Sequence, residues 1–196
     1  MAKPKGLILE EDLVAQEFDL EEITGRDFSE DEPLLFEIGE AVADFVRDRS
    51  ASNKGIGGKT LPKPYSKVYQ ESADFKLFGK SANDVNMRLT GDMLDSIEII
   101  DAQGSKLLVG ITDENAPKAH GHMTGKNGQV PKMKREFFGL TADELNKVLK
   151  EFKSDIKKLP KAGESEETSA VRTLGDLEAQ IESIGESGDL FTFEES

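Results

Sequence analysis

The sequence predicts an α+β fold, in which a small antiparallel sheet packs against one or two helices, with long loops and acidic N- and C-terminal arms. Two helical patterns indicate it, because apolar residues recur at steps of three and four over positions 35–46 and again over 145–159. Between them, positions 97–111 alternate apolar and polar residues around a turn-like segment at 101–104, which is typical of a β-hairpin. The length of 196 residues fits one domain with extensions.

The charge is distributed unevenly along the chain. The net charge is −14, of which residues 1–33 and 161–196 each contribute −8, whereas residues 34–160 carry +2. We therefore expect an acidic N-terminal arm (1–33), an α+β domain (34–160) and an acidic linker with a C-terminal interaction arm (161–196). Acidic arms either keep a protein soluble or lie across the basic surface of a neighbour in an assembly, and the composition is compatible with both roles.

The composition excludes several classes of protein. The chain has no cysteine and only two histidines, which excludes disulfide frameworks, cysteine-bound zinc and a thiol nucleophile. Hydrophobic residues make up 36% and charged residues 33%, so the core is expected to be modest. No run of 18 apolar residues occurs, and the first apolar stretch is too short for a signal peptide. We therefore expect a soluble protein made in the cytoplasm, with no membrane partner.

The first predicted helix begins near Ser29 and runs to about Arg49. Ser29 and Glu32 have the spacing of a capping box, and Pro33 is tolerated in a first helical turn. The N-terminal arm before it shows only a loosely helical pattern.

The β part of the chain follows. We expect strands at 85–89, 93–100 and 106–111, the last two joined as an antiparallel hairpin. A helical turn capped by Thr90 or Asp92 is expected just before the hairpin.

The second predicted helix has the clearest start. Thr141 and Glu144 form a capping box, and Leu140 with Leu145 forms a hydrophobic staple across it. The apolar stripe continues without interruption until Pro160 ends the helix, which is expected to pack on the sheet.

Residues 50–69 are predicted to form a long surface loop because glycine and proline recur in it. Its fragment 57–60, Gly-Gly-Lys-Thr, is similar to the end of a phosphate-binding loop. The match fails, because Asn53 stands where the first glycine is required, a helix instead of a strand precedes the loop, and Pro62 and Pro64 prevent a following helix.

Residues 112–135 are predicted to form a second polar loop, which holds His120 and His122. A His-x-His pair binds a metal only with further ligands, and the sequence places none, so we expect no metal and no cofactor. The two loops share basic side chains, which leaves a DNA- or nucleotide-binding module as the alternative function. These side chains are Lys54, Lys59, Lys63, Lys67, Lys118, Lys126, Lys132, Lys134 and Arg135.

The C-terminal arm carries apolar residues at helical spacing beyond a linker rich in Gly, Ser and Glu. We expect a short amphipathic helix followed by two aromatic residues, and we expect the arm to dock on another subunit. The residues concerned are Leu174, Leu177, Ile181, Ile184, Phe191 and Phe193.

Five segments in order resemble those of tailed-bacteriophage virion morphogenesis proteins. The similarity covers roughly residues 34–158 and starts with a helix that ends in basic residues. The segments are Pro64-Tyr65-Ser66-x-x-Tyr69, Leu89-Thr-Gly-Asp-Met-Leu-Asp-Ser-Ile97, the strand end Val109-Gly110, Ala119-x-x-His122-x-x-Gly125 and Val130-Pro131-x-x-x-Arg135-x-Phe137-Phe138-Gly139-Leu140. This chain departs from the pattern in the spacing between Pro131 and Arg135 and in its two acidic arms.

The resemblance implies a tail-completion, tail-terminator or neck protein of the virion, assembled in the host cytoplasm. Such a subunit forms a ring of six or twelve copies at the head-proximal end of the tail. Its neighbours there are the tail tube or sheath protein and the head-completion or connector proteins, with at most transient contact with genomic DNA. Tyr65, Tyr69, His122 and Arg135 would then belong to interaction or packing surfaces.

The resemblance also implies that the protein is not an enzyme and has no catalytic residue. A hydrolase that used His122 with a carboxylate would need a nucleophile, and no serine of this sequence lies in a nucleophile-elbow context.

Overall fold

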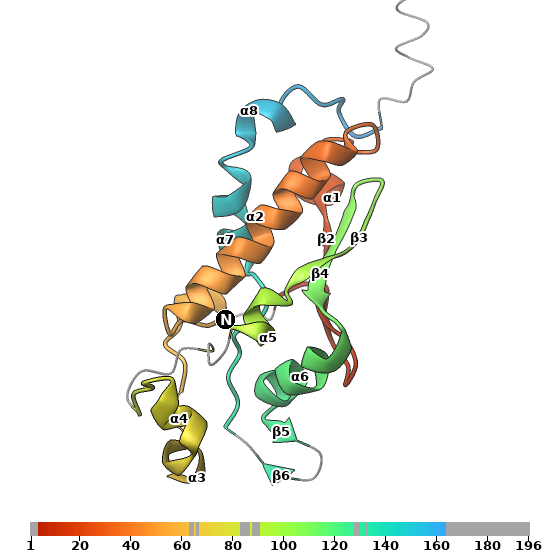
Figure 1. The fold of residues 1–196 in the computed structure, drawn as a ribbon. Helices are drawn as coiled ribbons and strands as arrows, with labels where there is room; N and C mark the ends of the chain where they lie inside the picture. Colours follow the sequence, from red (N-terminus) through yellow and green to blue (C-terminus); the bar gives the residue numbers. More distant parts are fainter. Residues whose placement is uncertain are drawn as a thin grey trace, which may run out of the picture. The chain divides into compact units, whose positions relative to one another are not determined.

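The structure, a computed structural model, has the predicted α+β fold (Figure 1). It describes residues 4–62, 65, 67–82, 87, 91–127, 130–131 and 133–163. Four antiparallel strands form a sheet in the order β1-β2-β4-β3. Their bounds are β1 Leu7–Leu9, β2 Val14–Asp19, β3 Glu98–Gln103 and β4 Lys106–Ile111. The chain divides into two compact units, Met1–Leu159 and Pro160–Ser196, and the second is described only through residue 163.

The expectation that residues 1–33 form an arm outside the domain is wrong. Strand β2 lies inside the sheet, where it pairs with β4 from Val14 opposite Ile111 to Asp19 opposite Lys106. The short helix α1, Leu20–Thr24, follows directly, capped by the Asp19 side chain. The N-terminal residues are therefore part of the domain and supply half of the strands of its main sheet.

Helix α2, Glu32–Ala51, covers one face of the sheet and packs on β3 and β4. Its cap is Asp31 in place of the expected Ser29, and the Asp31 side chain accepts a hydrogen bond from the Leu34 amide. A Cβ on Gly39 would lie only 2.6 Å from the Ile99 side chain, so this glycine allows the helix to approach the sheet closely.

The predicted hairpin is present as β3 and β4. The segment before it is the short helix α5, Asp92–Asp95, so the strand expected over 93–100 begins only at Glu98. Strand β3 runs on to Gln103, and the turn itself is formed at Gly104, whose φ of 59° favours glycine. Most of the strand expected at 85–89 lies outside the described residues.

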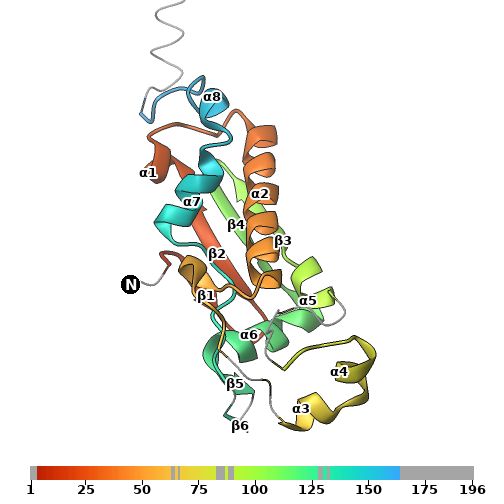
Figure 2. The ribbon, with the colours of Figure 1, turned by 90° about the vertical axis from the view of Figure 1, so that its left-hand side faces the viewer.

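The second predicted helix is divided into α7, Ala142–Leu149, and α8, Lys153–Ile156. Its start is confirmed, because Thr141 and Glu144 form the capping box. Between the two helices, the amides of Glu151 and Lys153 form tighter i to i−3 hydrogen bonds. Ile156 and Leu159 remain buried, so the apolar stripe continues across the break. Helices α7 and α2 contact each other, and Figure 2 shows both over the same face of the sheet.

Both expected loops contain regular structure. The first holds the 3-10 turn η1, Ile56–Gly58, and leads into α3, Lys67–Glu71, and α4, Ala73–Leu77. The second holds the 3-10 turn η2, Asp113–Asn115, helix α6, Ala116–Thr124, and the two-residue strands β5, Lys126–Asn127, and β6, Val130–Pro131. Burial explains α6, because Ala116, Ala119 and Met123 recur at helical spacing and are all within the core.

Among the described residues, no helix combines the length and the apolar character needed to span a bilayer.

Candidate interaction site

The structure brings four of the predicted site residues into one cluster. The ring centroids of Tyr65 and Tyr69 are 5.1 Å apart, and the guanidinium carbon of Arg135 lies 5.3 Å from the Tyr65 centroid. The Arg135 amide donates to the carbonyl of His122 at 2.8 Å. Segments that are distant in the sequence therefore meet here.

Phe75 completes an aromatic trio that the sequence did not indicate. Its ring lies 5.6 Å from Tyr65 and 5.3 Å from Tyr69, both in edge-to-face geometry. Such contacts stabilise a pair by about 0.5–1.5 kcal/mol beyond the burial of area. Helix α4 supplies Phe75, α3 supplies Tyr69, and Tyr65 precedes both, so the trio forms the inner side of the lobe made by α3 and α4.

Arg135 connects this lobe to the rest of the domain. Its side chain is buried among the aromatic residues, and burial lowers the pKa of Arg135 while the nearby Tyr65 opposes the change. A guanidinium keeps its charge at neutral pH, so the contact with Tyr65 is a cation–π interaction. Burial also raises the pKa of Tyr69, with a smaller effect from Asp74 in the same direction. Buried arginine and tyrosine side chains in such contacts typically pack the domain and hold its segments in position.

The side chains of His120 and His122 point in different directions and cannot bind one metal ion together. Both lie in α6, where residues two apart point about 200° apart around the helix axis. The His122 ring lies 6.5 Å from the ring of Phe137, nearly perpendicular to it. No group of three or more His, Asp or Glu side chains able to hold a metal occurs in the part of the chain that the structure describes.

A buried ion pair is the main feature that the sequence did not predict. Arg49 Nη1 lies 2.9 Å from Glu144 Oε1, and both side chains are only 6% exposed. The second nitrogen of Arg49 donates to the carbonyl oxygens of Phe137 and Gly139 at 2.6 and 2.9 Å. Arg49 was expected only as a helix end, and the two partners are 95 positions apart, so no local pattern indicates the pair.

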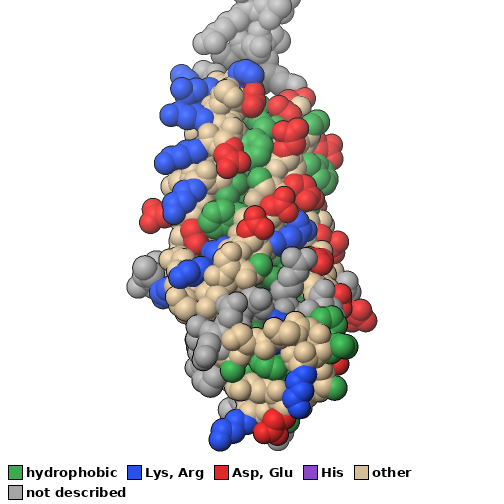
Figure 3. All heavy atoms as spheres, turned by 60° about the vertical axis from the view of Figure 1, so that its left-hand side comes forward, with side chains coloured by type: hydrophobic (Ala, Val, Ile, Leu, Met, Phe, Trp, Pro, Cys, Tyr) green, Lys and Arg blue, Asp and Glu red, His purple; other side chains and the backbone are tan. Residues whose placement is uncertain are grey.

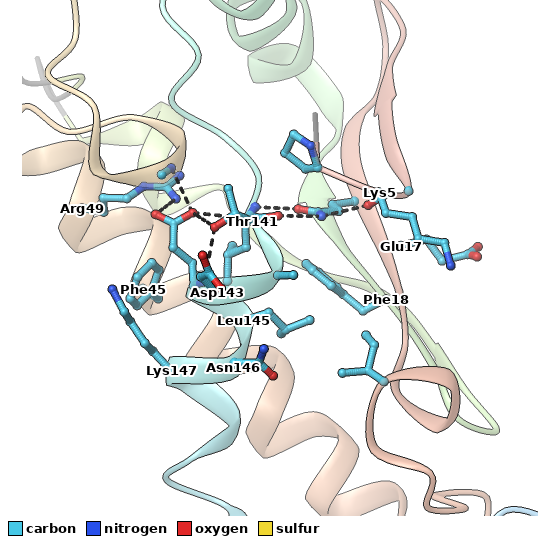
Figure 4. Close-up of a pocket in the computed structure, with 18 of the residues that line it drawn as sticks. Lys5, Glu17, Phe18, Phe45, Arg49, Thr141, Asp143, Leu145, Asn146 and Lys147 are labelled. Carbon is cyan, nitrogen blue, oxygen red and sulfur yellow. Dashed lines mark hydrogen bonds and ion pairs between the residues drawn. The ribbon is translucent and has the colours of Figure 1, made fainter. Parts of the chain in front are cut away.

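Glu144 also binds the glycine-rich turn. Its Oε2 accepts hydrogen bonds from the Gly57 amide and the Thr141 amide, both at 3.0 Å (Figure 4). Burial by itself raises the pKa of Glu144, but the amide of Thr141, the charge of Arg49 and the amide of Gly57 together lower it below the ordinary value. An amide of the fragment that is similar to a phosphate-binding loop is thus used within the protein.

A cavity of about 890 Å³ extends along both sides of the start of α7. Figure 4 shows Phe45 and Lys147 on one side of the helix, and Phe18, Glu17 and Lys5 on the other. The described residues that line it include lysines and carboxylates but no serine or histidine, and the Thr141 hydroxyl serves the helix cap. The Thr141 hydroxyl, which donates to the Glu144 carboxylate at 3.1 Å, is thus engaged in the cap of α7.

The α3–α4 lobe exposes several large apolar side chains between its charged ones, which are Lys67, Glu71, Asp74 and Lys76. Val68 is 82% exposed, Leu77 79% and Phe78 48%. The remaining predicted site residues lie outside the described residues, so their positions stay a prediction. They are Leu174, Leu177, Ile181, Ile184, Phe191 and Phe193.

The chain matches no family model, no curated protein and no solved structure.

Proposed function

We propose that the chain is a structural, non-enzymatic subunit of the head–tail connection of a tailed-phage virion. Copies form a ring at the head-proximal end of the tail and join the tail to the head. The order of the five sequence segments supports this proposal, because three of them contribute residues to the cluster around Tyr65 and Arg135.

The exposed apolar surface of the α3–α4 lobe carries the proposal. Its inner side is fixed by three aromatic rings, whereas Val68, Leu77 and Phe78 point outward from it. These three side chains come from a segment of eleven residues, and exposed apolar side chains that lie close together mark a protein–protein contact more often than a ligand site. A surface at one end of a subunit suits the heterologous contacts that close a ring.

No observation favours the DNA- or nucleotide-binding alternative to the same degree. The Gly57 amide donates to Glu144, Arg135 is buried, and Lys134 forms an ion pair with Glu136 at 2.7 Å. The Gly57 amide and Arg135 are thus engaged within the protein, and the charge of Lys134 is balanced by Glu136.

The test is the mass of the full-length protein, alone and mixed with tail-tube subunits of the same phage. We expect a ring of six or twelve copies, and we expect Val68→Asp with Leu77→Asp to give a folded monomer. Ile23→Asp is the control, because Ile23 is 43% exposed on α1, outside the lobe. A wild-type protein that stays monomeric in both samples contradicts the proposal, and a salt-sensitive shift of DNA would support the alternative.

A further inference from the structure

A strip of partly buried apolar side chains lies between α2 and the α7–α8 segment, and we call it the α2–α7 groove. Figure 3 shows hydrophobic side chains in a stripe between a column of Lys or Arg side chains and a series of Asp or Glu side chains. We define this α2–α7 groove by Ala41 and Phe45 of α2, the buried Val148 of α7, and Phe152. Ala41, Phe45 and Phe152 are only partly buried against the core.

The two rims of the groove carry opposite charge. The exposed acidic residues of α2 beside the groove include Glu37, Glu40, Asp44 and Asp48. The other rim exposes five lysines, Lys147, Lys150, Lys153, Lys157 and Lys158, against two exposed acids, Asp143 and Glu151. Of these lysines, only Lys158 forms an ion pair with a described residue, Asp155. In a chain of net charge −14, a column of unpaired cations beside apolar side chains favours an acidic, amphipathic occupant.

We propose that the α2–α7 groove binds residues 174–184 of a neighbouring copy of this chain. This rests on the ring proposed above. Residues 173–196 contain no lysine or arginine, so every charge of that segment is negative. The described structure ends at residue 163, and the ten residues before Leu174 span at most about 36 Å, which limits the arm to nearby surfaces.

The sequence of the arm matches both rims. With the helical winding that its apolar spacing predicts, Glu178, Glu182 and Glu186 align on one flank of the apolar stripe, because they are four positions apart. The opposite flank presents Gln180 and Ser187, which carry no charge, and one acid, Asp176. The more acidic flank faces the lysine rim, the less acidic flank faces the acidic rim of α2, and this asymmetry sets the direction in which the arm lies.

Docking of one arm is weak by itself. Four aliphatic side chains contribute on the order of 5–10 kcal/mol of burial, and ordering the segment costs a similar amount. In a ring, each groove lies beside a neighbour's arm, so the effective concentration is high. The arm therefore binds within an assembly and much less between free subunits.

Crosslinking in the full-length protein tests this proposal. Benzoylphenylalanine replaces Leu177 in unlabelled copies, which are mixed with an excess of copies labelled with heavy nitrogen, and irradiation is followed by mass spectrometry. We expect labelled peptides from positions 41–45 and 148–153 to be crosslinked to the arm. Lys150→Glu with Lys153→Glu is expected to lower the yield about tenfold, and Glu178→Lys with Glu182→Lys to restore it.

The control is Lys118→Glu, which changes an exposed lysine of α6, outside the groove, and is expected to leave the yield unchanged. Crosslinks to unlabelled copies alone would show that each arm binds its own chain, and crosslinks elsewhere or none would exclude the groove. Each of these results overturns the proposal. The mass of the same sample is read separately: a ring without groove crosslinks refutes only the docking, whereas a monomer refutes the proposed function.

Discussion

Replacing Glu144 with glutamine removes the negative charge that joins three separate parts of the domain. The carboxylate accepts hydrogen bonds from Arg49 on α2, Gly57 in η1 and Thr141 at the start of α7. Glutamine has nearly the same size, so Glu144→Gln isolates the loss of charge and of one acceptor. The guanidinium of Arg49 then stays buried without a counter-ion.

The structure sets the expected magnitude. Removing one partner of a buried ion pair costs about 3–5 kcal/mol of stability, because it leaves an uncompensated charge in the interior. The carbonyl oxygens of Phe137 and Gly139 continue to accept hydrogen bonds from Arg49, and the glutamine oxygen replaces one acceptor. We therefore expect the lower end, a loss of about 3 kcal/mol in the free energy of unfolding.

The assay is equilibrium unfolding in urea, followed by far-UV circular dichroism at neutral pH. Glu136→Gln is the matched control, since Glu136 pairs with Lys134 while 45% exposed, and a pair of this kind contributes about 0–1 kcal/mol. The double variant Arg49→Met with Glu144→Gln is expected to lose less than the sum of the two single variants, because no buried charge remains. If Glu144→Gln is no more destabilising than Glu136→Gln, the ion pair does not hold the domain together.

Three further predictions concern the same domain. The pKa of Glu144 is lowered in the folded state, so the ionised carboxylate stabilises the fold fully above about pH 4.3, and this stabilisation is lost as the pH falls through the folded-state pKa. The difference in unfolding free energy between wild type and Glu144→Gln should therefore shrink in acid. An unchanged difference would contradict the direction of the pKa shift. Gly110→Ala should destabilise the protein by about 1–3 kcal/mol in thermal unfolding, because the new Cβ would lie 2.6 Å from the Val14 carbonyl oxygen. Gly104→Ala is the comparison: its new Cβ would have no atom within 4 Å, so its effect measures backbone strain without a clash. Gln16→Leu should cost about 2 kcal/mol in urea unfolding, because the Gln16 side chain bonds both the amide and the carbonyl of Leu140, and a neutral effect would show that these groups find other partners.

Local patterns predicted the elements whose signals are contained within a few residues. The capping box at Thr141 and the apolar stripe of α2 are of this kind, since each depends on neighbours three or four positions away. Strand β2 has no such signal, because Gln16 is buried along with Val14 and Ala15, and the usual alternation of a strand is lost. Its burial depends on β4, about ninety positions later.

The candidate site was predictable only in part. Tyr65, Tyr69, His122 and Arg135 were identified through the resemblance, but their convergence depends on how α6 and the α3–α4 lobe fold. Helix α6 was not expected, because its sequence of Pro, Gly and His has low helix propensity and only tertiary burial of its alanines favours it. The pairing of Arg49 with Glu144 joins two residues that were each assigned a purely local role.

The position of β2 inside the sheet has a consequence during synthesis of the chain. Both of its neighbours are needed to pair its backbone, yet β4 begins only at Lys106, long after Asp19 has been made. At about 5–20 residues per second, the first strands wait roughly 4–20 s for their partner. Charged residues disfavour the association of unpaired strands, so the high density of Glu and Asp in the first 33 residues is suited to that interval.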